Sequence, residues 1–559
     1  MINNEITLTR KTRNLTTYWS EVLLLLLSDL FFSAAFPGFI SENGIGIFGF
    51  VALIPLFAVI RNAPWKVVWF YGWFHGLTCY LLFNYWLSSF HPLAIFISPL
   101  VFSTYMLALF PALKLADRLF PKHGYLVQAM IWIAYEYLRT KGFFGYAYGI
   151  LGYTQYRFLP FIQISSIFGV WGVTLMTIFP SVLLGRLLGD ILNGSIVWSR
   201  DGVGGFFRTY RIVWISYIVF FIAVMTFGFL AIADQKRQKP DRQWRIALIQ
   251  HNADSWKGGF TTYQRNFNNL RRLSLEALAH GDPEILIWSE TAFVPAVYWH
   301  STYKTDPQTY GLVKEFVDFA QELPIPLLTG NDDGRKADES LPAVNPDGSY
   351  NRVDYNAVIL YENGKLKETY RKQHLVPMTE HFPYKKTLPR IYKILREHKY
   401  HFWEKGTEPV VFETNDGVRF STPICFEDIF GCLSAAFVSS GADVIVNMTN
   451  DSWSGSVPAE MQHLAMAVFR SVENRRSVIR GTNSGMSCVI DPSGKILAMM
   501  EPFKKGYLNT EVPIYTYSNT IYTRYVDWFP KLLFWLSLIL LTGGSLYRII
   551  SRVHTRGSV

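Results

Sequence analysis

Three residues in the polar second half of the chain could together carry out covalent acyl transfer. Cys425 lies in TPICFEDIF, Glu290 in IWSETAF and Lys372 in YRKQHLVPMTEHF. A thiol attacks efficiently only as a thiolate, so it needs a base, which Glu290 would supply. The attack creates an oxyanion, which the ammonium of Lys372 and the backbone N–H after the cysteine would stabilise. These residue types predict acyl chemistry through a Cys425 thioester.

Short apolar runs that are typical of strands accompany all three residues. Such runs alternate with helical patterns, which favours an α/β sandwich whose strand ends would bring the three residues together. The predicted strands are 245–250, 284–290, 325–330, 356–361, 408–414, 419–426, 443–450 and 487–492, and the predicted helices are 262–279, 311–322 and 460–475. A segment rich in Asp, Asn, Pro and Gly, residues 336–352, is predicted to be a surface excursion.

Apolar stretches of membrane-spanning length lie on both sides of this polar part. Half of the 559 residues are hydrophobic, which is too many on average for one soluble domain. The predicted spans are about 18–36, 44–60, 67–88, 93–113, 125–138, 159–189, 210–233 and 528–549. The sequence therefore predicts a polytopic α-helical bundle of about eight spans. Residues 1–239 would form seven spans, 240–520 the catalytic domain, and 521–559 a final helix with a tail.

The basic residues of the short connections predict an orientation. Alternate connections carry Arg10, Lys11 and Arg13; Arg61 and Lys66; Lys114, Arg118 and Lys122; and Arg186, Arg200, Arg208 and Arg211. The positive-inside rule places these connections in the cytoplasm, so seven spans put residues 240–520 on the other side. The net charge of +10 is thus mainly a topology signal, and no nucleic-acid motif gives it another meaning.

Several motifs together resemble a known family. SETAFVP, KQHLVP, CFED, NMTNDSW and VENRRSVIRGTNSG are similar to the Glu-Lys-Cys signatures of the nitrilase superfamily. Their order and spacing resemble those of its membrane-embedded branch, the apolipoprotein N-acyltransferases. IAYEYLR and GYAYGILGYTQYRFLPFIQISSIFGVWGVTLM resemble the transmembrane pattern of that branch, so the likeness extends over nearly the whole chain.

This resemblance implies a nitrilase-like αββα sandwich and adds four supporting residues. Glu380 would hold Lys372 or the incoming amine, Glu427 would orient the nucleophile, and Phe426 and Trp256 would also belong to the site. The chain departs from the family pattern at three places, one of which is Thr422, where the family has a less polar context. Family members usually have Phe-Gly where Met378 and Thr379 stand, and commonly have Tyr at the position of Phe426.

The resemblance also implies the substrates and the compartment. The acyl donor would be a membrane phospholipid, and the acceptor a diacylglyceryl-modified apolipoprotein with a free α-amino group. The enzyme would lie in the bacterial inner membrane with its catalytic domain on the periplasmic side. Because a thioester is converted to an amide in a downhill step, no cofactor or metal is expected. His374 and the other histidines have no metal-ligand spacing.

Two other functions remain open from the residues alone. A membrane-tethered amidase would use the same Glu-Lys-Cys site, with water resolving the acyl-enzyme. A transporter or scaffold with an inert nitrilase-like domain would form no acyl-enzyme at Cys425. The sequence also leaves open a disulfide between Cys432 and Cys488, which an oxidising compartment would permit.

Overall fold

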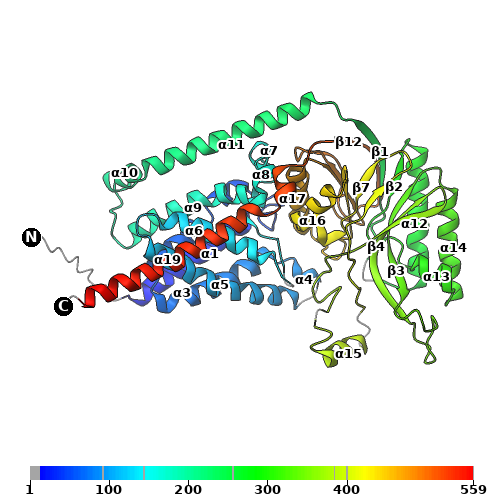
Figure 1. The fold of residues 1–559 in the computed structure, drawn as a ribbon, viewed down its shortest axis with the longest axis horizontal. Helices are drawn as coiled ribbons and strands as arrows, with labels where there is room; N and C mark the ends of the chain where they lie inside the picture. Colours follow the sequence, from blue (N-terminus) through cyan, green and yellow to red (C-terminus); the bar gives the residue numbers. More distant parts are fainter. Residues whose placement is uncertain are drawn as a thin grey trace, which may run out of the picture.

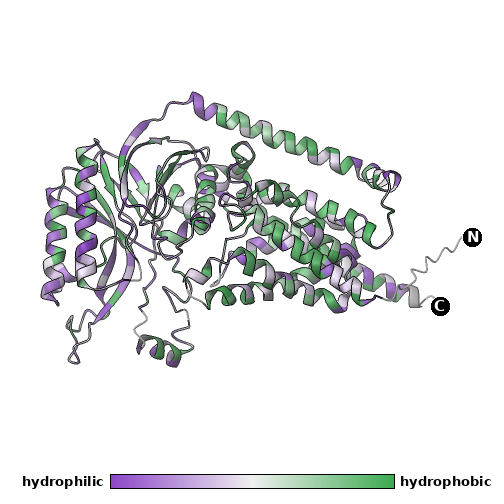
Figure 2. Ribbon diagram, turned by 180° about the vertical axis from the view of Figure 1, so that it is seen from behind, coloured by the Kyte–Doolittle hydropathy of each residue, from purple (hydrophilic) through white to green (hydrophobic). Residues whose placement is uncertain are grey.

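The computed structural model describes residues 13–90, 93–142, 145–254, 257–382, 384–397 and 401–557. It consists of a helical bundle and, at one end of the bundle, an α/β part (Figure 1). The bundle helices are largely hydrophobic, whereas the outer helices of the α/β part carry many hydrophilic residues (Figure 2).

Long helices form the bundle. They are α1 (Leu15–Ala35), α3 (Trp65–Phe83), α5 (Ala94–Leu119), α6 (Gly124–Arg139), α9 (Val170–Leu192), α11 (Arg211–Arg237) and α19 (Trp528–Gly557). Shorter elements are η1 (Gly46–Phe50), α2 (Ile54–Asn62), α4 (Leu87–Phe90), η2 (Leu151–Gln155), α7 (Leu159–Ile162), α8 (Ser165–Phe168) and α10 (Arg200–Thr209). Within the described residues, five helices are long and apolar enough to cross a membrane: α1, α5, α9, α11 and Trp528–His554 of α19. The chain is therefore a membrane protein.

Two predicted spans are not single helices, which corrects the expectation for 44–60 and 159–189. The first is divided into η1 and the nine-residue α2, which at 1.5 Å per residue covers only about 14 Å. The second is divided into α7, α8 and α9, with a break at Gly169, whose φ is 66°. An L side chain is strained in this left-handed conformation, so glycine permits the break. Hydropathy reports how apolar a stretch is and does not report such breaks.

The basic connections meet at the end of the bundle that is remote from the sheets. Arg61 pairs with Asp117 at 2.7 Å and with Asp190 at 2.5 Å, which joins the ends of α2, α5 and α9. Arg548 of α19 donates to the carbonyl of Arg118 at 3.3 Å. The described structure thus gathers at one end many of the cations that the sequence places in alternate connections.

Two six-stranded sheets form the centre of the α/β part. The first has the order β12-β1-β2-β3-β4-β5, and the second β11-β10-β9-β8-β7-β6. Their strands are β1 (Arg242–Gln250), β2 (Ile285–Ile287), β3 (Leu327–Lys336), β4 (Arg352–Glu362), β5 (Lys365–Arg371), β6 (Val411–Glu413), β7 (Arg419–Ser421), β8 (Val444–Thr449), β9 (Ser477–Thr482), β10 (Cys488–Ile490), β11 (Ile496–Met499) and β12 (Gly506–Ile514). β1, β2 and β3 are parallel, as are β7, β8 and β9.

Helices cover the outer faces of both sheets, so the α/β part is an αββα sandwich. Apolar side chains from the two sheets, such as Leu248 and Val446, form the core between them. α12 (Phe260–Ala279) and α14 (Pro307–Glu322) pack on the outer face of the first sheet, and α13 (Val297–Tyr303) lies beside them. α16 (Gly431–Ser439) and α17 (Val457–Asn474) pack on the second sheet.

α17 lies between the second sheet and the bundle, and every residue from Ala459 to Asn474 is buried. Two smaller helices complete the described elements, α15 (Pro389–Glu397) and α18 (Ile521–Tyr525), together with η3 (Cys425–Ile429). The predicted surface excursion is the exposed hairpin connection between β3 and β4.

Candidate active site

Glu290, Lys372 and Cys425 follow strands of both sheets. Glu290 comes three residues after β2, and Lys372 directly after β5, both in the first sheet. Cys425 begins η3, four residues after β7 of the second sheet. The charges of Glu290 and Lys372 both act on the Cys425 thiol, so the structure brings the three predicted residues into one site.

Glu290 is held by three polar contacts. Its Oε1 accepts from Asn356 Nδ2 at 2.8 Å and lies 3.3 Å from Lys372 Nζ. Its Oε2 accepts from the backbone N–H of Asn450 at 2.9 Å. Burial raises the pKa of Glu290, and the ammonium of Lys372 opposes that rise. A carboxylate with a raised pKa is suited to take up and return a proton.

Lys372 is completely buried between two carboxylates. Its Nζ lies 2.8 Å from Glu380 Oε1, and Glu380 Oε2 accepts from the backbone N–H of Val376 at 2.8 Å. Burial alone would lower the pKa of Lys372, but Glu290 and Glu380 outweigh this effect and raise it well above its usual value. The raised pKa keeps Lys372 cationic, and a fixed cation is suited to stabilise an oxyanion.

Cys425 has a backbone conformation that non-glycine residues rarely adopt. Its φ is 49°, in the left-handed region, where a side chain costs about 1–3 kcal/mol. Asn447 Nδ2 contacts the carbonyls of Pro423 at 3.2 Å and Cys425 at 3.3 Å, which helps to hold the turn. Burial and the charge of Glu290 raise the pKa of the Cys425 thiol, while Lys372 lowers it. The thiol therefore needs a base to become a nucleophile.

Glu427 joins the Cys425 turn to the end of β5 and to the segment after it, which begins with Lys372. Its carboxylate accepts from the backbone N–H groups of Ile424 at 2.8 Å, Gln373 at 2.7 Å and His374 at 2.9 Å. The hydroxyl of Tyr370 donates to it at 2.9 Å. Burial raises the pKa of Glu427 to about 7, against these hydrogen bonds. The carboxylate thus fixes the position of the nucleophile relative to Lys372.

The remaining residues that the sequence placed at or near the site are Phe426, Met378 and Trp256. The ring of Phe426 is partly buried, contacts the ring of Phe430 at 5.3 Å between centroids and packs against the apolar cluster that α17 shares with the bundle. Met378 has a φ of 63°, the conformation that a glycine would adopt without strain. Trp256 lies outside the described residues. The structure therefore groups Glu380, Glu427 and Phe426 near the three central residues.

A buried charge network next to Cys425 was not predicted from the sequence. His463 of α17 lies 2.6 Å from Asp428 and 3.2 Å from Asp451, and Arg480 pairs with the same two acids at 2.5 and 3.3 Å. Burial alone would lower the pKa of His463, but Asp428 and Asp451 raise it to about 9. Arg480 lies within a buried strand, where a charged residue indicates a fixed ion pair and could have suggested the network.

The Cys425 side of the sandwich contacts the bundle through polar bonds. Trp86 donates to Gln462 at 3.2 Å, and Gln462 donates to the carbonyl of Pro37 at 2.7 Å. Arg470 of α17 donates to the hydroxyl of Tyr153 at 3.1 Å. The site therefore lies beside the apolar bundle.

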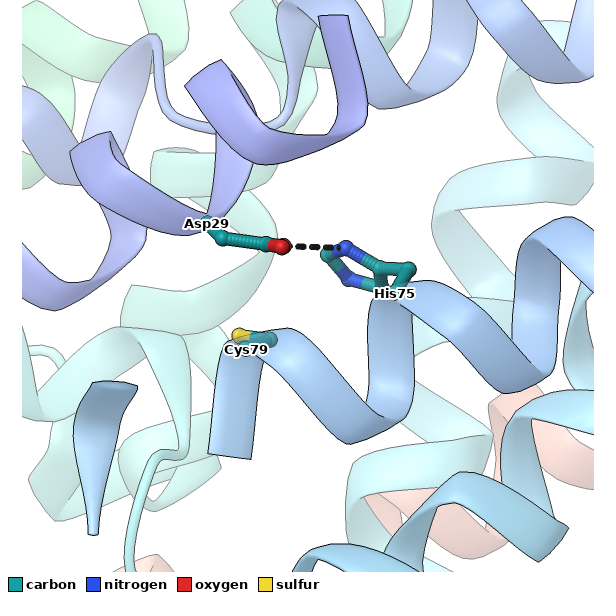
Figure 3. Close-up of side chains that lie close together, drawn as sticks. All are labelled: Asp29, His75 and Cys79. Atoms are coloured by element: carbon teal, nitrogen blue, oxygen red, sulfur yellow. Dashed lines mark ion pairs between the residues drawn. The ribbon is translucent and has the colours of Figure 1, made fainter. Parts of the chain in front are cut away.

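A separate polar cluster lies inside the bundle. Asp29 of α1 points towards His75 of α3, and Cys79 lies one turn further along α3 (Figure 3). Asp29 Oδ1 is 2.5 Å from His75 Nδ1, and Asp29 Oδ2 accepts from Thr78 at 2.5 Å. The side-chain atoms that could bind a cation lie within 4.8 Å of one another. Both carboxylate oxygens already contact protein groups, so the cluster acts as a polar link between two helices.

The four cysteines Cys79, Cys425, Cys432 and Cys488 are free thiols. The disulfide that the sequence left open between Cys432 and Cys488 is therefore not formed in the structure.

Known proteins resemble both parts of the chain. Residues 28–183 match the apolipoprotein N-acyltransferase N-terminal domain, and residues 245–522 match the carbon-nitrogen hydrolase family. Apolipoprotein N-acyltransferase 1 of Treponema denticola is 39% identical over 525 residues, covering 92% of this chain and 94% of the relative. The protein of the same name from Treponema pallidum is 36% identical and covers 95% and 96%.

A solved structure also resembles this chain. An amidase from Nesterenkonia sp. is 18% identical, with a TM-score of 0.33, and the match covers 52% of this chain and 92% of the amidase.

Proposed function

The chain belongs to the apolipoprotein N-acyltransferase family, and we propose that it acts through a thioester on Cys425. It is an acyltransferase of lipoprotein biosynthesis. The observation that carries the proposed mechanism is the contact between buried Glu290 and Lys372 in a site where both charges act on Cys425.

In the first half-reaction, Glu290 takes the proton of the Cys425 thiol, and the thiolate attacks the ester carbonyl of a phospholipid. Lys372 stabilises the resulting oxyanion, a contribution that is commonly about 3–4 kcal/mol in a desolvated site. The carbon–oxygen bond then breaks, and Glu290 returns the proton to the departing alkoxide. The products are lysophospholipid and an acyl-enzyme.

In the second half-reaction, the α-amino group of the acceptor attacks the thioester carbonyl. The carbon–nitrogen bond forms, the carbon–sulfur bond breaks, and the thiol of Cys425 is restored. Glu290 again moves the proton from nitrogen to sulfur. Glu380 and Glu427 would be positioning residues, because Glu380 holds Lys372 and Glu427 holds the turn that carries Cys425.

The donor would be a membrane phospholipid, and the acceptor a diacylglyceryl-modified apolipoprotein. Packing of Phe426 against the apolar cluster that α17 shares with the bundle supports a lipid donor, because acyl chains would reach the site from that side. The gathering of cations such as Arg61 and Arg548 at the remote end supports a cytoplasmic position for that end. The sandwich would then lie on the periplasmic side of the inner membrane.

We also propose that the chain crosses the membrane about eight times. η1 together with α2, and then α3 and α6, would complete the five longer helices. Residues 1–239 would be the first bundle segment, 240–520 the catalytic domain and 521–559 the returning helix with its tail. Contacts of α3 with α1 and α5, and of α6 with α5 and α19, support their inclusion in the bundle.

An acyl-enzyme assay separates this function from that of an amidase. Purified protein is incubated with phosphatidylglycerol and a diacylglyceryl-cysteine peptide, and separately with small aliphatic amides. The proposal predicts an N-acylated peptide and lysophospholipid in the first reaction. Ammonia release from the amides without any peptide acylation would contradict it.

A further inference from the structure

Asp332 lies on the strand face that contacts the catalytic base. On β3, the side chain of Leu328 points into the core between the sheets, and Gly330 and Asp332 lie on the same face. A Cβ at Gly330 would lie 2.7 Å from Glu290 Cα, so this face contacts the backbone of Glu290. Asp332 is two residues further along, a distance of about 7 Å.

The strand register also places Asp332 beside Asn356. The two residues are directly opposite each other in the antiparallel β3–β4 pair, so their side chains share a face. Asn356 donates to Glu290 at 2.8 Å, and the charge of Glu290 acts on Asp332. A further carboxylate, besides those of Glu290, Glu380 and Glu427, therefore lies at the edge of the catalytic site.

Asp332 differs from the acids around it in its charge partners within the described part of the chain. Asp333 pairs with Arg335 at 2.8 Å and Arg371 at 2.7 Å, and Asp354 pairs with Arg352 at 2.7 Å. Among the described residues, no basic side chain lies within 4 Å of Asp332.

The polar contact of Asp332 comes from a neutral group, because Trp403 Nε1 donates to its Oδ1 at 3.1 Å. Burial raises the pKa of Asp332 to about 7, and Asp354 and Glu290 add to this rise, while Arg352 opposes it. Such a carboxylate would be stabilised by a cation brought by a substrate.

We propose that Asp332 binds the α-ammonium group of the acceptor and takes one proton from it. The inference rests on the proposed function, in which an amine attacks the Cys425 thioester. At neutral pH most of the acceptor is an ammonium, because α-amino groups have a pKa of about 8. An ammonium has no lone pair, so the acceptor must lose a proton before it can attack.

The protons balance when Asp332 and Glu290 each accept one. An ammonium loses two protons on becoming an amide N–H. An N–H bond of the ammonium breaks as Asp332 takes the first proton. Asp332 then releases this proton to water. The nitrogen then forms its bond to the thioester carbonyl carbon, and Glu290 takes the second proton. The carbon–sulfur bond breaks, and that proton restores the Cys425 thiol.

The test measures the two half-reactions separately. The Asp332→Asn variant keeps an oxygen that can accept from Trp403 but loses the charge, and Trp403→Phe keeps the charge but loses the N–H donor. Thioester formation is measured with phosphatidylglycerol, whose headgroup has no amine. Acyl transfer is then measured from the isolated acyl-enzyme to a diacylglyceryl-cysteine peptide, and to hydroxylamine, which is mostly neutral at neutral pH.

Asp332→Asn should form the thioester at the wild-type rate and lose about tenfold or more in kcat/KM for the peptide, as expected for a lost bond to a charged group. Its reaction with hydroxylamine should be unchanged. The wild-type transfer rate should rise with pH through about 7. In Asp332→Asn, the rise in transfer rate near pH 7 should disappear, and the rate should rise only with the ionisation of the amine near pH 8.

Three results would overturn the inference. The first is transfer to the peptide by Asp332→Asn at the wild-type rate. The second is a loss of thioester formation in Asp332→Asn equal to its loss of peptide transfer. The third is a peptide-specific loss in Trp403→Phe as large as that in Asp332→Asn, which would mean that Asp332 only anchors Trp403. If the wild-type protein forms no thioester from phosphatidylglycerol, the proposed function itself fails. The two failures are therefore distinguishable.

Discussion

Glu290 Oε1 lies 3.3 Å from Lys372 Nζ, and both side chains are buried, with 5% and 0% of each residue exposed. The two residues come from opposite sides of the first sheet's centre, one after β2 and the other after the edge strand β5. A base and a cation are thus fixed next to each other in a site that excludes most water. Electrostatic interactions are stronger in such a site than in solution.

Replacing either member of this pair should stop the first half-reaction. Glu290→Gln keeps the shape but removes the base, and Lys372→Met keeps the length but removes the cation. Each change should slow thioester formation by about a hundredfold or more, as is typical for such groups. Release of lysophospholipid measures the rate, with the exposed Glu408→Gln as a control. Near-normal rates in either variant would show that the site lies elsewhere.

Gly330→Ala should also impair thioester formation, although the new side chain is only a methyl group. Its Cβ would lie 2.3 Å from the backbone nitrogen of Thr291, so Glu290 would have to move. A shift of about 1 Å can cost about a hundredfold in rate. Gly311 in α14 has open space, and Gly311→Ala should leave the rate unchanged. A fully active, folded Gly330→Ala enzyme would contradict the tight packing behind Glu290.

The elements that carry Glu290 and Cys425 could be predicted because their apolar runs are clear. EILIWSE and RFSTPICF contain β2 and β7, and the long periodic helices α12, α14 and α17 were also predicted. The αββα layers of the sandwich agree with the expectation. Each of these segments has a buried apolar face, so its hydrophobic pattern follows the structure.

Four strands were not predicted, and their residues show why. β5, KLKETYR, is an edge strand whose first four residues are exposed, so it lacks an apolar face. β9 contains the buried Arg480, a charged residue that interrupts the apolar run of the strand. β11 and β12 also carry many partly exposed residues. Asp332 was missed because its significance depends on its register opposite Asn356, which one sequence does not reveal.

The charge of His463 should make stability depend on pH. Its pKa is raised to about 9 in the folded protein, compared with about 6.5 in an unfolded chain. The folded state therefore holds this proton more tightly. The stabilisation is complete below about pH 6.5 and is lost as the pH rises through about 9.

Thermal unfolding in detergent between these two pH values measures the effect. The Tm of the wild type should fall as the pH rises. His463→Gln should have a lower Tm at the acidic end and a smaller decrease across the range. An equal decrease in both proteins would show that His463 does not gain its proton on folding.

Cysteine labelling in intact spheroplasts tests the orientation. Ala337 lies in the exposed connection between β3 and β4, and Ser195 is exposed between α9 and α10. In a background with Cys425 and Cys432 replaced by alanine, a membrane-impermeant thiol reagent should label Ala337→Cys and should not label Ser195→Cys. After permeabilisation, both should react. The opposite pattern would place the sandwich in the cytoplasm, away from the proposed acceptors.

The mass of the intact protein after exposure to phospholipid tests the central claim most directly. Wild-type protein incubated with phosphatidylglycerol of one acyl composition should gain the mass of one acyl group, and hydroxylamine should remove it. Cys432→Ala should gain the same mass, whereas Cys425→Ala should gain none. A hydroxylamine-sensitive acyl adduct that persists in Cys425→Ala would contradict the account, because the thioester would then form on another residue.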